Sequence, residues 1–191
     1  MLPGSTAERL LHGSPCPVAV APKGYRERLA DEPGIIGCGY DDSQSSQRAL
    51  EAARRVAAAT GAQLQVIRAF EPLMYDLPPG NAAFGGMSSY NDALLVRATE
   101  ELDAAVARIE TDGAEAHIKM GDAVRVLTDA SEELDLLLVG SRGYGPMHAV
   151  LVGGVAGRLV TEAACPVIVF PRSAGLTEDD SRFAETAVLH G

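Results

Sequence analysis

A short apolar run that ends in a glycine-rich loop constrains this sequence more than any other feature. Residues 136–139 read Leu-Leu-Leu-Val, the loop Gly140-Ser-Arg-Gly143 follows, and nine residues later come Gly153 and Gly154. An amphipathic stretch, residues 155–163, comes next. A buried strand that opens through glycines into a helix places backbone N–H groups and a positive helix N-terminus at the end of a sheet. This order predicts a phosphate-binding loop, and with it a nucleotide ligand.

Apolar strands and amphipathic helices alternate along most of the chain. This alternation predicts a parallel sheet with right-handed crossover connections. Residues 71–90 have three prolines, three glycines, three aromatic residues and no clear period, so we expect a long loop or lid there. The periodicity predicts strands over 35–40, 63–70, 114–120, 134–139 and 166–170, and helices over 44–60, 91–112, 122–133 and 155–163.

Two polar or glycine-rich turns follow predicted strands. Asp41-Asp42-Ser43 follows the first strand and Gly140 to Gly143 follows the fourth. Ligands of parallel sheets bind beyond the carboxyl ends of the strands, at the point where the strand order reverses. If these two strands are neighbours, both turns face one crevice, although the residues alone leave that adjacency open. Two roles for Asp41 also stay open, because its carboxylate could contact a ligand or cap the following helix.

Composition narrows the class of partner. The chain has 191 residues, a formal net charge of −10 and a pI of about 4.8, so we expect no binding to nucleic acid or to anionic membranes. There is no apolar run of the roughly 20 residues that a membrane span needs, and no signal-peptide pattern. The three cysteines and four histidines show no metal-type spacing. We therefore expect a cytoplasmic protein with reduced thiols and no protein-bound metal of its own.

The N-terminal segment repeats a later one. Residues 4–22 match residues 153–171 at a constant offset of 149. The repeat predicts that residues 1–24 are the last helix and strand of a preceding, truncated copy of the same domain. The apolar strand at 17–21 would then lack its own sheet, so we expect it to dock on the edge formed by residues 166–170, within the chain or across a dimer. Nine positions are identical: Gly4, Ala7, Arg9, Leu10, Cys16, Pro17, Val18, Val20 and Pro22.

With these motifs in place, residues 34–172 resemble the universal stress protein family. Its signature is Gly-x-x-Gly, nine residues, a third glycine, and then Ser or Thr. Gly140, Gly143 and Gly153 match that spacing. The family's Asp-Gly-Ser turn after the first strand is similar to Asp41-Asp42-Ser43, with Asp42 in place of glycine. Residues 68–72 and 165–169 are similar as well, which leaves residues 173–191 as a polar tail.

The resemblance implies a fold and a ligand. The fold would be an α/β sandwich of three layers, adenine nucleotide hydrolase-like, with a five-stranded parallel sheet in the order 3-2-1-4-5. The ligand would be ATP, ADP or AMP, with or without Mg²⁺ or Mn²⁺. The protein would have a regulatory or sensing role in stress response and would pair as a homodimer through its last strands.

The resemblance also implies a set of binding residues. One group would hold the adenine and ribose, namely Asp41, with Tyr40 beside it, and the backbone near Ala69. A second group would line the ribose and phosphates, namely Val139, Gly140 and Gly143, while Arg142 either contacts a phosphate or stays solvated. The last group would present backbone N–H groups to the phosphates, namely Gly153, Gly154 and Val155.

One position departs from the family pattern. The Ser or Thr expected after the third glycine is Gly154, so a hydroxyl donor to phosphate is missing. A hydrogen bond to a charged group contributes about 1.5–3 kcal/mol, or about one to two decades of affinity. The alternative is therefore a dimerisation or interaction module that binds nucleotide weakly or not at all. Since no hydrolase or kinase motif is present, we expect no enzyme activity, with slow ATP hydrolysis left open.

Overall fold

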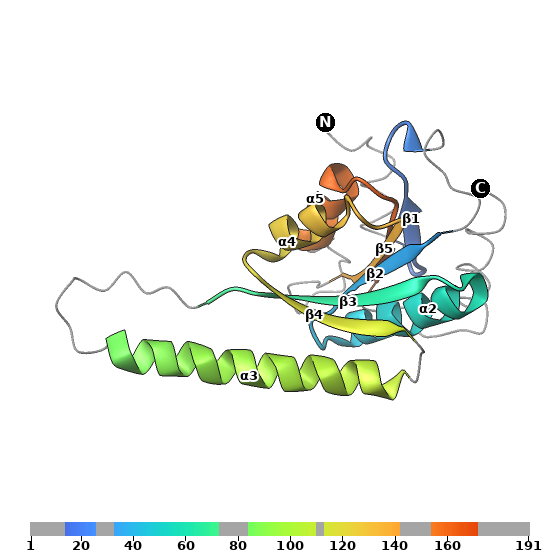
Figure 1. Cartoon of the computed structure of the whole chain (residues 1–191). Helices are drawn as coiled ribbons and strands as arrows, with labels where there is room; N and C mark the ends of the chain where they lie inside the picture. Colours follow the sequence, from blue (N-terminus) through green and yellow to red (C-terminus); the bar gives the residue numbers. More distant parts are fainter. Residues whose placement is uncertain (1–13, 26–32, 73–83, 110–112, 142–153, 172–191) are drawn as a thin grey trace.

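Six strands form one sheet at the centre of the protein, in the order β1-β6-β5-β2-β3-β4. The computed structural model describes residues 14–25, 33–72, 84–109, 113–141 and 154–171. The strands are β1 (Val18–Val20), β2 (Ile35–Gly39), β3 (Gln63–Phe70), β4 (Ala114–Met120), β5 (Leu136–Gly140) and β6 (Val167–Phe170) (Figure 1).

Helices cover both faces of the sheet and make three layers, with α4 and α5 above the strands and α2 and α3 below them (Figure 1). Leu50 and Val56 of α2 and Leu102 of α3 pack in a buried cluster with one face of the strands. Leu127 of α4 and Leu159 of α5 pack in a second buried cluster on the other face. The helices are α2 (Gln44–Thr60), α3 (Phe84–Arg108), α4 (Ala123–Ala130) and α5 (Gly154–Glu162). None of the helices within the described ranges is long and apolar enough to cross a membrane.

The expectation of a five-stranded, all-parallel sheet is wrong, because the sheet has a sixth strand. β2 to β6 run parallel to their neighbours, whereas β1 pairs antiparallel with β6 at the edge of the sheet. β2 lies between β3 and β5, and Ile36 of β2 is in register with Leu136 of β5. The first and fourth of the predicted strands are therefore neighbours, as a shared crevice requires.

Local signals account for several helix ends. Ser43 is the N-cap of α2, and its hydroxyl accepts a hydrogen bond from the N–H of Ser46 at 3.2 Å. Gly61 ends α2 in the left-handed conformation, with φ of 72°. Asp122 caps α4, because its carboxylate accepts hydrogen bonds from the N–H groups of Val124 and Arg125. Each of these caps satisfies backbone groups that the helix itself leaves without partners.

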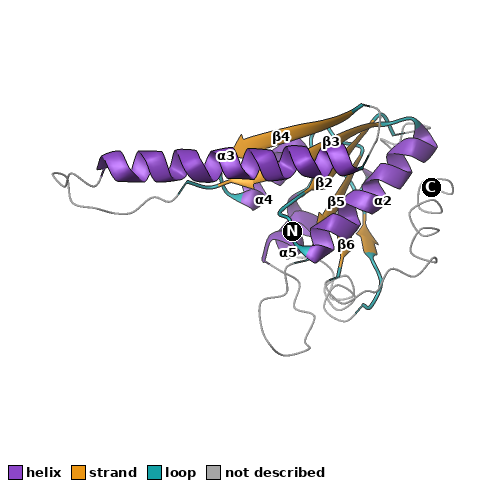
Figure 2. Ribbon diagram, turned by 90° about the horizontal axis from the view of Figure 1, so that it is seen from below, coloured by secondary structure: helices purple, strands orange, loops and turns teal. Residues whose placement is uncertain are grey.

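The start of α3 differs from the expected loop. The helix begins at Phe84, within the stretch 71–90 in which we expected no regular structure, while residues 73–83 lie outside the described part. The N-terminal part of α3 extends past the end of the sheet (Figure 2), and Ser89 and Tyr90 are exposed. Helical periodicity in a sequence arises from a face that packs on a core. Ser89 and Tyr90 do not pack on the core, which is consistent with the absence of a clear period in this part of the sequence.

The N-terminal strand docks on the sheet edge, as the repeat predicted. Val18 of β1 pairs with Val169 of β6, and Val20 pairs with Val167. The pairing lies within the chain, and β1 occupies the outer edge of β6. A homodimer through the last strands would therefore require β1 to leave this edge.

Candidate functional site

A cavity of about 240 Å³ opens at the carboxyl ends of β2, β3 and β5. This is the point where the strand order reverses, since the chain proceeds from β2 to β3 on one side and returns to β5 on the other. The N-terminus of α5 closes part of the wall. Seven of the predicted site residues line the cavity: Tyr40, Asp41, Ala69, Val139, Gly140, Gly154 and Val155. The other three, Arg142, Gly143 and Gly153, lie outside the described residues.

Several residues of the wall were not expected from the sequence. Glu71 and Gly121 directly follow β3 and β4, so the rule that ligands bind at carboxyl ends of strands could have found them. Ile67 and Leu127 supply apolar surface to the wall. They belong to no motif, and in the sequence they cannot be distinguished from other apolar core positions. The remaining unexpected wall residues are Gly39, Ser46, Ala123 and Ala156.

Gly140 lets the first turn of α2 approach the end of β5. A Cβ atom at this position would lie 2.5 Å from the backbone nitrogen of Ser46 and 2.7 Å from the hydroxyl of Ser45. The Ser45 hydroxyl also donates a hydrogen bond to the carbonyl of Ser141 at 3.2 Å. Glycine is therefore required here by packing, whether or not a ligand is bound.

Asp41 shapes the turn between β2 and α2 and also lines the cavity. Its Oδ1 accepts a hydrogen bond from the backbone N–H of Ser43 at 3.0 Å, and it is half-buried. The N-cap of α2 is Ser43. Of the two roles left open by the sequence, capping belongs to the neighbouring Ser43, and Asp41 is one of the residues that line the cavity.

Asp42, which stands where the family's Asp-Gly-Ser turn has glycine, takes the left-handed backbone conformation, with φ of 61°. Aspartate tolerates this region better than most residues. Its Oδ1 accepts hydrogen bonds from the Tyr40 hydroxyl at 2.8 Å and from Gln47 Nε2 at 3.1 Å. These two hydrogen bonds, the tyrosine's first, hold the pKa of Asp42 below its usual range. The departure from the family pattern is thus supported by contacts that glycine cannot make.

Tyr40 connects this turn to α3. Its side chain is buried, and its hydroxyl accepts a hydrogen bond from Arg108 Nη2 at 3.3 Å. Burial, together with the hydrogen bond to Asp42, raises the pKa of Tyr40 to about 12. The tyrosine therefore stays neutral at physiological pH and acts as a donor to Asp42 and an acceptor from Arg108.

The described wall of the cavity includes two acidic residues and the positive end of a helix dipole. Asp41 and Glu71 contribute carboxylates, and no lysine or arginine is among the described wall residues. Gly154 and Val155 are the first residues of α5. The N–H groups of a first helical turn have no partner within the helix and carry the positive end of its dipole. The cavity therefore offers acceptors for hydroxyl or amino groups and donors for an anionic group.

The protein is an α/β sandwich with a mostly parallel sheet and a cavity at the point where the strand order reverses. Residues 34–171 match the profile of the Universal stress protein family, and the chain belongs to that family.

Two relatives illustrate how far the similarity extends. The universal stress protein Rv2319c of Mycobacterium tuberculosis is 27% identical over 174 residues, which are 90% of this chain and 59% of that protein. A universal stress protein of Thermus aquaticus is 30% identical over 135 residues, which are 68% of this chain and 93% of that protein. The chain thus spans about six-tenths of the length of the mycobacterial relative.

Solved structures share the fold. The universal stress protein UspA from Lactobacillus plantarum superimposes with a TM-score of 0.63 at 23% identity, covering 73% of this chain and 98% of that one. A universal stress protein in complex with cAMP superimposes with a TM-score of 0.52 at 24% identity, covering 72% of this chain and 96% of that one. At these identities the similarity concerns the fold.

Proposed function

We propose that this protein binds an adenine nucleotide in the cavity and acts as a nucleotide-dependent regulator in stress response, without enzymatic turnover. The observation that carries the proposal is the convergence of two strand ends and one helix start on a single cavity, through Asp41, Val139, Gly140, Gly154 and Val155. A universal stress protein of similar fold has been solved with cAMP, a nucleotide of the proposed class.

The two kinds of polar group in the cavity wall suit the two polar parts of a nucleotide, its sugar hydroxyls and its phosphates. The Asp41 carboxylate would accept hydrogen bonds from the ribose hydroxyls, with Tyr40 and the backbone near Ala69 against the adenine. The N–H groups of Gly154 and Val155 would donate to phosphate oxygens, as helix N-termini do. Arg142, Gly143 and Gly153 would also contact the phosphates.

A divalent ion fits this arrangement. Asp41 and Glu71 are oxygen donors of the kind that Mg²⁺ and Mn²⁺ prefer. No group of three or more His, Cys, Asp or Glu side chains suited to a metal occurs among the described residues. Such an ion would therefore depend on the nucleotide phosphates for most of its ligands, and it would offset the repulsion between those phosphates and the two carboxylates.

Titration calorimetry with ATP and Mg²⁺ tests the proposal. Wild-type protein should bind one nucleotide, and Asp41→Ala should bind it at least tenfold more weakly, because a hydrogen bond to a charged group is lost. The matched control is Asp129→Ala, an exposed aspartate of α4, which should bind like wild type. An absence of heat and of any melting shift at millimolar ATP would reject nucleotide binding.

A second candidate function rests on Gly154. Without the family's hydroxyl at this position, the chain would be a dimerisation or interaction module that binds nucleotide weakly or not at all. Binding that appears only in Gly154→Ser would favour this second function over the first. For both candidate functions we propose a cytoplasmic protein that binds neither nucleic acid nor membranes.

The internal repeat supports a proposal about domain organisation. We infer that residues 1–24 descend from a preceding copy of the domain, that residues 34–172 form the complete copy, and that residues 173–191 are a tail. The docking of β1 on β6 supports this division, because the two strands are the equivalent strands of the repeat.

A further inference from the structure

β1 and β6 are nearly the same strand in sequence. Cys16-Pro-Val-Ala-Val-Ala-Pro22 and Cys165-Pro-Val-Ile-Val-Phe-Pro171 are identical at five of seven positions. The two differences place Ala19 where β6 has Ile168, and Ala21 where β6 has Phe170. β1 is therefore a version of β6 with two large side chains reduced to methyl groups.

The pairing between the two strands is symmetric. Val18 pairs with Val169, Ala19 with Ile168, and Val20 with Val167. In the repeat, Val18 is equivalent to Val167 and Val20 to Val169, so exchanging equivalent residues reproduces the same ladder. The β1–β6 pair thus has a local two-fold axis at Ala19 and Ile168. A two-fold axis through identical strands is the geometry of a homodimer interface.

The contacts of β1 are strong on one face of the sheet and weak on the other. Pro17 is buried, and Val18 packs against the cluster formed by α4, α5 and the sheet. On the α2 face, Ala19 is exposed beside Ile168, which is 3% exposed. A second β6 in this place would present isoleucine where β1 presents only a methyl group.

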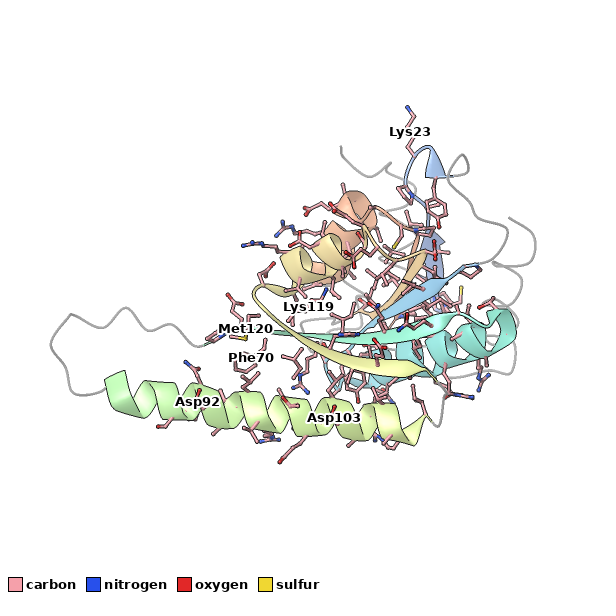
Figure 3. The ribbon with its side chains drawn as sticks, viewed as in Figure 1. Lys23, Phe70, Asp92, Asp103, Lys119 and Met120 are labelled. Carbon is pink, nitrogen blue, oxygen red and sulfur yellow. The ribbon has the colours of Figure 1, made fainter. Side chains whose placement is uncertain are left out.

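A turn after β1 helps to hold the strand in place. The chain leaves the sheet with Lys23 at the tip of the turn (Figure 3) and returns at Tyr25. The Tyr25 hydroxyl donates a hydrogen bond to the carbonyl of Asp135 at 2.7 Å, and its ring packs against the same cluster as Val18.

From this symmetry we propose that β1 is an internal substitute for the β6 strand of a second copy, and that it keeps the chain monomeric by occupying a homotypic edge. When β1 leaves, two copies pair through β6, with Ile168 opposite its own counterpart. Two monomers contain two β1–β6 pairs, whereas the dimer contains a single β6–β6 pair. Dimerisation therefore loses one strand pairing, and the equilibrium favours the monomer while β1 is intact. The partner for this surface is a second copy of this chain. The proposal concerns the sheet edge and is independent of nucleotide binding at the cavity.

Substitution within β1 tests the proposal in the full chain. The double variant Ala19→Pro/Val20→Pro removes two consecutive N–H donors. Alternate N–H groups of an antiparallel strand point toward its neighbour, so one of the two lost donors is directed at β6. Sedimentation analysis at 1–200 µM should give the monomer mass of 19.9 kDa for wild type and twice that mass for the variant. The matched control Ala21→Pro lies one residue beyond the ladder and should stay monomeric.

A cross-linking arm identifies the interface. Ile168→Cys, made in a Cys16→Ser background, places a thiol at the two-fold axis. With the β1 prolines present, oxidation should form a disulfide-linked dimer, whereas with wild-type β1 it should not. If the proline variant does not fold by circular dichroism, Tyr25→Ala weakens docking without altering the strand and should raise the dimer fraction at high concentration.

Three results would overturn the proposal. A folded proline variant that stays monomeric at 200 µM would show that β6 has no affinity for its own copy. If the proline variant does not fold, a folded Tyr25→Ala protein with the same dimer fraction as wild type would likewise show that β6 has no affinity for its own copy. A wild-type dimer at micromolar concentration would show that β1 does not block association.

Discussion

Replacing Gly154 by serine tests whether the N-terminus of α5 contacts the phosphates of a nucleotide. Gly154 is the first residue of the helix, and a Cβ atom there would meet no atom of the described residues within 4 Å. The substitution therefore adds a hydroxyl without a clash with the described part of the chain, at a residue that lines the cavity.

The expected gain follows from the hydrogen bond that the hydroxyl adds. A bond to a charged phosphate contributes about 1.5–3 kcal/mol, so the Kd for ATP should fall by about one to two decades. Serine also exceeds glycine in helix propensity by a few tenths of a kcal/mol, which raises stability but changes affinity little. Titration calorimetry with ATP and Mg²⁺ measures the Kd, and thermal melting without nucleotide measures the stability separately.

Gly154→Ala is the matched control, because it adds the same Cβ without the hydroxyl. The alanine variant should keep the wild-type Kd. Equal tightening in both variants would assign the effect to the backbone and refute the hydrogen bond. An unchanged Kd in Gly154→Ser would place the phosphates away from the start of α5.

Two further predictions concern stability. Gly140→Ala should lower the free energy of unfolding by about 1–3 kcal/mol in urea denaturation, because its Cβ would meet the Ser46 nitrogen at 2.5 Å, while Gly154→Ala should not; equal midpoints would refute this packing role. Hydrogen bonds hold the pKa of the Asp42 carboxyl below its value in the unfolded chain, which is about 3.9. The ionised carboxylate therefore stabilises the fold fully above about pH 3.9, and this stabilisation is lost as the pH falls through the pKa of the folded state. Asp42→Asn, which cannot titrate, should therefore lose less stability than wild type between pH 5 and about pH 2; parallel losses would contradict this effect.

The sequence predicts most of the parallel sheet and much of the cavity because their signals are local. The run 136–139 and its glycines lie within one short segment, and Asp122 lies directly before the helix that it caps. Docking of β1 on β6 is a long-range pairing, yet it could be predicted because the repeat makes the two strands equivalent.

Other features depend on contacts between residues far apart in the chain. The hydrogen bond from Arg108 to Tyr40 joins residues 68 positions apart, and Arg108 belongs to no motif. The close approach of α2 to Gly140 arises from helix packing, so the spacing of glycines indicates a loop but not this contact. Asp42 differs from the family's glycine, and the sequence does not show that its backbone takes the left-handed conformation that glycine adopts most easily, with φ of 61°.

Amide chemical shifts of the isotope-labelled wild-type protein, recorded during titration with ATP and Mg²⁺, test directly whether the cavity at the switch point binds an adenine nucleotide. Binding there should give saturable shifts that are largest at Asp41, Ala69, Gly140, Gly154 and Val155, with little change along α3. An absence of saturable shifts at millimolar ATP, or shifts centred away from this cavity, would contradict it.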